Sequence, residues 1–95
     1  MADFLDANGI VWEYEPTLFV LSWTPDGAPT SGMRPDFYLP DHDMYVEVTV
    51  QKPCTRKNRK IRQLREQHPE ITVRLLNRSD VSRLVAGDFE LHELI

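Results

Sequence analysis

The chain has 95 residues, 41% of them hydrophobic, which allows one compact core but no second one, so we expect a single domain over residues 1–95. Its longest apolar runs fall far short of the roughly 20 residues that cross a bilayer, and no signal peptide pattern opens it. A lone cysteine, Cys54, excludes an internal disulfide and a thiolate zinc site. We therefore expect a soluble, cytoplasmic protein that does not contact membranes.

The net charge of −4 is distributed unevenly along the chain. Residues 1–51 carry nine Asp or Glu and a single basic residue, Arg34, whereas residues 52–65 hold seven of the eleven Lys and Arg. This basic segment can be a solvated helix face, or it can contact phosphates beside a carboxylate cluster. Charge alone does not decide between the two.

The first third of the chain predicts a helix, an interrupted strand and a loop. Residues 2–7 have a short helical pattern that ends at Asn8-Gly9. Aromatic and branched residues over 10–23 predict a strand with an irregularity at Pro16. Residues 24–32 contain Pro-Asp-Gly and predict a loop that could serve as a mobile flap.

Residues 33–39 and 44–50 predict two strands joined by a turn at 40–43. A turn centred between Asp41 and His42 places Asp36 opposite Glu47. The same register puts Tyr38 opposite Tyr45 and Arg34 opposite Thr49. It gathers the apolar residues on the other face, which we expect to be the core: Phe37, Leu39, Met44, Val46, Val48 and Val50.

The last third predicts a helix, a strand and a second helix. Good helix formers run from Thr55, a candidate N-cap, to Gln67, and only Ile61 and Leu64 mark a buried side. Residues 71–76 alternate like a strand, and Ser79 can cap the helix that follows. Residues 89–95 can form a short strand or a tail. The whole pattern predicts a mixed α/β fold.

Two carboxylates opposite each other on paired strands repel, so something should offset the repulsion between Asp36 and Glu47. A hard divalent cation does so, because Mg²⁺ takes oxygen ligands and commonly uses one or two protein carboxylates. The alternative is that the register differs, or that both side chains point apart into solvent.

The segment Gly32-Met-Arg-Pro-Asp-Phe-Tyr-Leu-Pro40, followed by Met44-Tyr-Val-Glu-Val-Thr49, resembles the signature of the PD-(D/E)XK nuclease superfamily. That signature has Pro-Asp at the start of one strand and Glu-x-Lys in the next. The resemblance implies a restriction-endonuclease-like core, ordered helix, strand, strand, strand, helix, strand, with a mixed sheet flanked by helices. It also implies an endonuclease that hydrolyses phosphodiester bonds with Mg²⁺ or Mn²⁺, its expected substrate being DNA.

Thr49 stands where the superfamily pattern has its lysine. Several members supply this cation from the following helix, so the resemblance points to Lys57, which shares the stripe of Ile61 and Leu64. Lys60 is the second candidate, and Arg34, opposite Thr49, is the third. Each can equally be an ordinary surface cation.

By the same resemblance, Asp36, Glu47 and the Val48 carbonyl hold the metal ion, and Glu15 resembles an additional upstream acidic residue of some members. The basic segment would contact phosphates without reading sequence. These candidate nucleic-acid-binding residues are Arg34, Lys52, Arg56, Arg59, Arg62 and Arg65.

Two other functions remain open from the sequence. Loss of the motif lysine is compatible with a catalytically inactive nuclease-like module that only binds nucleic acid. The basic helix could instead meet an acidic protein in a protein-interaction or regulatory module. A homodimer would suit a small domain that contacts two strands.

Overall fold

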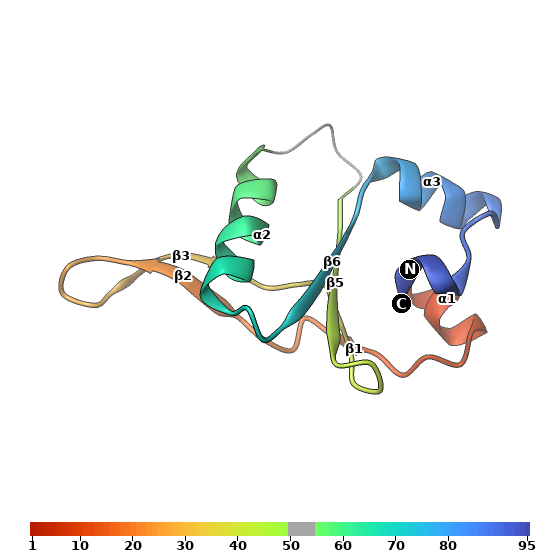
Figure 1. The fold of residues 1–95 in the computed structure, drawn as a ribbon, viewed down its shortest axis with the longest axis horizontal. Helices are drawn as coiled ribbons and strands as arrows, with labels where there is room; N and C mark the ends of the chain where they lie inside the picture. The colour runs from red at the N-terminus through yellow and green to blue at the C-terminus, as the bar shows by residue number, and fades with distance from the viewer. Residues whose placement is uncertain (50–54) are drawn as a thin grey trace.

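The computed structural model describes residues 1–49 and 55–95, which have a mixed α/β fold (Figure 1). A mixed four-stranded sheet has the order β1-β4-β5-β6, and a separate antiparallel pair is formed by β2 and β3. The strands are β1 (Glu13–Tyr14), β2 (Phe19–Trp23), β3 (Pro29–Met33), β4 (Phe37–Leu39), β5 (Met44–Val48) and β6 (Thr72–Leu76). The helices are α1 (Ala2–Ala7), α2 (Thr55–Gln67), α3 (Arg78–Ala86) and α4 (Leu91–Leu94).

The hairpin of β4 and β5 has the predicted register. Tyr38 pairs with Tyr45 and Leu39 with Met44, so the prediction is confirmed for these strands. Extending this register by one pair beyond Phe37 and Val46 brings Asp36 opposite Glu47. The chain then crosses through α2 to β6, which runs parallel to β5.

Both faces of the four-stranded sheet are packed, so the expectation that the core lies on the face of Phe37 and Val46 alone is wrong. One face meets α1, α3 and α4, the other meets α2 and the β2–β3 pair, as Figure 1 shows. The first core cluster contains Leu5, Phe37, Leu39, Met44, Val46, Leu76, Phe89 and Leu94. The second contains Leu21, Met33, Ile61, Leu64 and Val73. Val50, predicted for the first face, lies outside the described residues.

Three segments differ from their sequence prediction. Residues 29–32, expected as loop, belong to β3, because they pair with β2 and Thr30 shares a hydroxyl hydrogen bond of 2.8 Å with Ser22. The expected strand over 10–23 divides into β1 and β2. It breaks at Glu15, whose φ of 47° is left-handed. Residues 24–28 keep the loop that composition predicted. The expected strand over 33–39 is shortened to β4, because Met33 belongs to β3.

The end of the chain also differs in detail. Asn77, not Ser79, is the N-cap of α3, and its side chain accepts a hydrogen bond from the Asp80 amide while Asp80 bonds back to Asn77. Residues 91–94 form α4 instead of a strand or tail. Among the described residues, no helix has both the length and the apolar character needed to span a membrane.

Candidate functional site

Asp36 lies directly before β4 and is tied to the neighbouring strand. Its Oδ2 accepts a hydrogen bond of 2.9 Å from the Val48 amide of β5. The buried Pro35 precedes Asp36, and the Asp36 carbonyl accepts a 2.8 Å hydrogen bond from the Glu15 amide. These contacts fix the Asp36 carboxylate beside the end of β5, where the sequence register places it.

Glu47 is a buried carboxylate, with only 5% of its surface exposed. Within residues 1–49 and 55–95, no other charged residue is buried to this extent. Its Oε1 has no hydrogen-bond partner in the described part of the chain. Burial, followed by the nearby Asp36 carboxylate, raises the pKa of Glu47 from 4.5 to about 8, although Lys57 opposes the shift. Glu47 is therefore largely protonated at neutral pH unless another positive charge joins the site.

Lys57 comes from the first turn of α2 and reaches the carboxylates. Its Nζ donates a 2.9 Å hydrogen bond to the Val48 carbonyl and lies 3.8 Å from Glu47 Oε2. Helix α2 packs on the sheet through Ile61 and Leu64, and the bond from Lys57 to Val48 places its N-terminal turn beside the end of β5. The structure thus brings Asp36, Glu47 and the first-choice lysine together around Val48.

The second lysine of the sequence analysis has a different contact. Lys60 Nζ donates a 3.0 Å hydrogen bond to the Gly32 carbonyl, which ties α2 to β3. Arg34, the third candidate, is exposed. Of the three candidate cations, Lys57 is therefore the one that lies against Glu47.

Glu15 and Val48 were expected beside the metal. The Glu15 amide donates a 2.8 Å hydrogen bond to the Asp36 carbonyl, which brings the two residues together just beyond β1, and the role of Glu15 as a metal ligand stays a prediction. Among the described residues there is no group of three His, Cys, Asp or Glu side chains that could hold a metal ion. Val48 bonds to Asp36 through its amide and to Lys57 through its carbonyl. Sequence reasoning missed the role of this amide, because a backbone donor leaves no signal in residue type.

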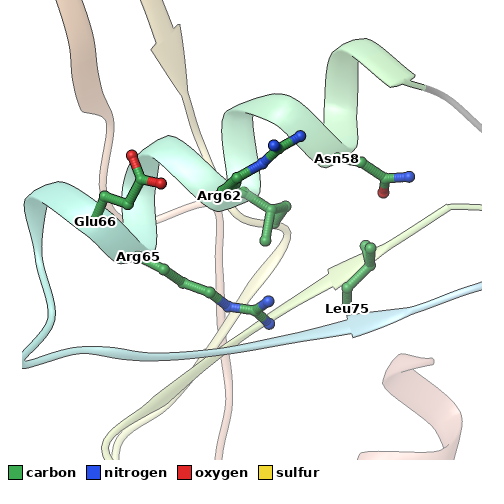
Figure 2. Close-up of a pocket in the computed structure, with 6 residues that line it drawn as sticks. Asn58, Arg62, Arg65, Glu66 and Leu75 are labelled. Atoms are coloured by element: carbon green, nitrogen blue, oxygen red, sulfur yellow. The ribbon is translucent and has the colours of Figure 1, made fainter.

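The basic residues of α2 are divided among different surroundings. Arg59, Arg62 and Arg65 are exposed, and the last two line an open groove between α2 and β6 (Figure 2). Arg65 also donates a 2.6 Å hydrogen bond to the Val73 carbonyl, so part of its bonding capacity is used within the fold. The predicted phosphate contacts at Lys52 and the Arg56 side chain lie outside what the structure describes.

Comparisons of this chain with family models, curated proteins and solved structures found no match. The chemistry of the site therefore follows from its own atoms. Two neighbouring carboxylates, one of which has a buried oxygen without a partner, form a set of hard oxygen donors together with the Val48 carbonyl. Such a set fits a divalent cation such as Mg²⁺, which takes further ligands from water and substrate phosphate.

Proposed function

We propose that this protein is a Mg²⁺- or Mn²⁺-dependent nuclease with a restriction-endonuclease-like core of the PD-(D/E)XK superfamily, and that its substrate is DNA. The observation that carries the proposal is the buried Glu47 carboxylate beside Asp36, with the Lys57 ammonium 3.8 Å away. A strongly shifted pKa with a specific charged partner is typical of functional sites. The match between Pro35-Asp36, Glu47 and the superfamily signature supports the same conclusion.

Asp36, Glu47 and the Val48 carbonyl would hold the metal ion. A bound divalent ion supplies an acidified water as nucleophile and neutralises charge on the phosphate. The protein's own part is to hold these oxygens in place: Asp36 through the Val48 amide and Glu47 through its burial. This rigid placement avoids reorganisation when the substrate binds.

Lys57 takes the role that the motif lysine has in the superfamily pattern. Its side chain is 30% exposed and reaches the carboxylates from α2, so it presents a positive charge both to the site and to solvent. There it can stabilise the negative charge that develops on the phosphate oxygens. Thr49, which stands at the motif position, lies at the end of β5 and bonds to the Leu76 carbonyl through its amide.

The decisive experiment measures cleavage of labelled single-stranded, duplex and branched DNA, and of RNA, in Mg²⁺, Mn²⁺ or EDTA. We expect cleavage that needs the metal and is lost in Asp36→Asn, which retains an oxygen for the Val48 amide and so preserves the fold. Lys57→Ala should lower turnover about a hundredfold, as removal of a charge-stabilising donor does, with little loss of affinity.

Lys60→Ala is the matched control, because it removes a lysine from the same helix whose hydrogen bond goes to Gly32. It should retain most of the turnover. Absence of cleavage on every substrate would refute the nuclease. If salt-dependent DNA affinity remained, the chain would be a binding module; if none remained, a protein partner for the basic helix would be the better reading.

A further inference from the structure

A groove distinct from the carboxylate pair runs between α2 and β6, with a volume of about 460 Å³. Figure 2 shows Leu75 pointing from β6 toward α2, and Arg65 extending from α2 toward β6. The side chains that line the groove are Asn58, Ile61, Arg62, Arg65, Glu66 and Leu75. It lies at the edge of the sheet, since β6 is the last strand in the order β1-β4-β5-β6.

The groove combines an apolar floor with a polar and cationic rim. Ile61 is buried and Leu75 is half-buried, so the floor offers hydrocarbon to a flat apolar face. Arg65 is held in place by its 2.6 Å hydrogen bond to the Val73 carbonyl. Asn58 and Arg62 are exposed and can bind a ligand without giving up a core contact. Glu66, the acidic member, lies farther along α2 from Asn58 than either arginine does (Figure 2).

The position of the groove connects it with the carboxylate site. Leu75 on β6 is the register partner of Glu47 on β5, and Asn58 follows Lys57 in α2. A nucleic-acid strand that follows the groove along α2 therefore arrives at Lys57 and the two carboxylates.

We propose that this groove binds one unpaired nucleotide of the substrate strand, with its base on Ile61 and Leu75 and its phosphate on Arg62 and Arg65. The volume is in the range of sites for small molecules and accommodates a single nucleotide. A paired base hides its faces in the stack, whereas an unpaired one exposes them to an apolar surface. The inference rests on the proposed nuclease function and specifies its substrate as single-stranded or branched.

The test is a fluorescence anisotropy titration in EDTA at fixed salt, where binding is measured without cleavage. The probes are a short labelled single strand, the same strand with its bases removed, and a blunt duplex. We expect the intact single strand to bind about tenfold more tightly than the abasic strand, because its base buries apolar surface on the groove floor that the abasic strand lacks. The blunt duplex should bind no more tightly than the abasic strand, because its paired bases cannot enter the groove.

Two variants separate the groove from general charge attraction. Arg62→Gln should weaken binding of the single strand about tenfold, whereas Arg59→Gln, which removes the same charge from an exposed residue outside the groove, should have about a twofold effect or less. Leu75→Thr keeps a strand-forming residue and should abolish the preference for bases over the abasic strand.

Equal losses in Arg62→Gln and Arg59→Gln, or equal affinity for intact and abasic strands, would overturn the proposal. The proposal would also fail if an oligoglutamate peptide displaced the labelled single strand as effectively as an unlabelled single strand does. That result would indicate that the groove binds an acidic protein. Each of these results leaves the nuclease itself to be judged by metal-dependent cleavage and Asp36→Asn. The two proposals can therefore fail separately.

Discussion

At the scale of single residues, the position of Glu47 has a cost in stability. A buried carboxylate beside a second one, with one oxygen unpaired, is unfavourable in the folded state. Lys57 offsets part of this cost from 3.8 Å, yet the pKa of Glu47 remains raised to about 8. Under the proposed function, a bound cation would offset the rest of this cost.

The pH dependence of stability should therefore change in Glu47→Gln. The folded-state pKa of about 8 exceeds the ordinary 4.5, so protonated Glu47 contributes stability that is fully present below about 4.5 and is lost as pH rises through 8. Glutamine does not ionise. In EDTA, the free energy of unfolding of the variant should therefore rise relative to that of the wild type by up to roughly 1.4 kcal/mol per pH unit across this window. Urea unfolding from about pH 5 to pH 9 measures the difference.

Glu13→Gln provides the control, because Glu13 is an exposed carboxylate on β1. Its unfolding free energy should follow that of the wild type at every pH. A Glu47→Gln curve parallel to the wild-type curve would show that the pKa of Glu47 is the same in the folded and unfolded states, so that burial beside Asp36 carries no electrostatic cost for a cation to offset.

At the scale of elements, the sequence predicts those parts whose pattern is local. The hairpin register was predictable because the turn at 40–43 and the alternation on both sides of it allow one alignment. The bounds of α2 were predictable from good helix formers and a following proline. Strand β3 was not, since Pro29, Ser31 and Gly32 have loop composition and are extended only by pairing with β2.

The start of α3 is a second case in which composition misled. Asn77 and Ser79 are both good N-cap residues, but Asn77 alone has Asp80 three residues later to complete the reciprocal bonds. Asn77→Ala should lower the free energy of unfolding by about 1 kcal/mol, the usual value of such a cap. Ser79→Ala is exposed within the helix and should change it by about 0.5 kcal/mol or less. Urea unfolding of the two variants side by side decides which residue caps the helix.

At the scale of the whole molecule, the candidate site depends on two layers meeting at one sheet. Asp36 and Glu47 come from the sheet, whereas Lys57 arrives only because α2 packs on it through Ile61 and Leu64. Sequence spacing suggested that Lys57 faces inward but could not specify which carbonyl it meets. That contact depends on how the helix crosses from β5 to β6, which is a tertiary property.

The two core clusters on opposite faces share the same strands, so we expect them to unfold as one unit. Leu64→Ala, at a fully buried position of the α2 side, should cost about 2 to 5 kcal/mol, whereas Val85→Ala, 86% exposed on α3, should be close to neutral. In a Trp23→Phe background, Trp12 reports on the opposite face, where it packs edge-on against Phe37. Trp12 fluorescence and circular dichroism should then show the same lowered midpoint in Leu64→Ala. An unchanged Trp12 midpoint would mean that α2 can leave the sheet alone, carrying Lys57 away from Glu47 while the rest of the fold stays intact.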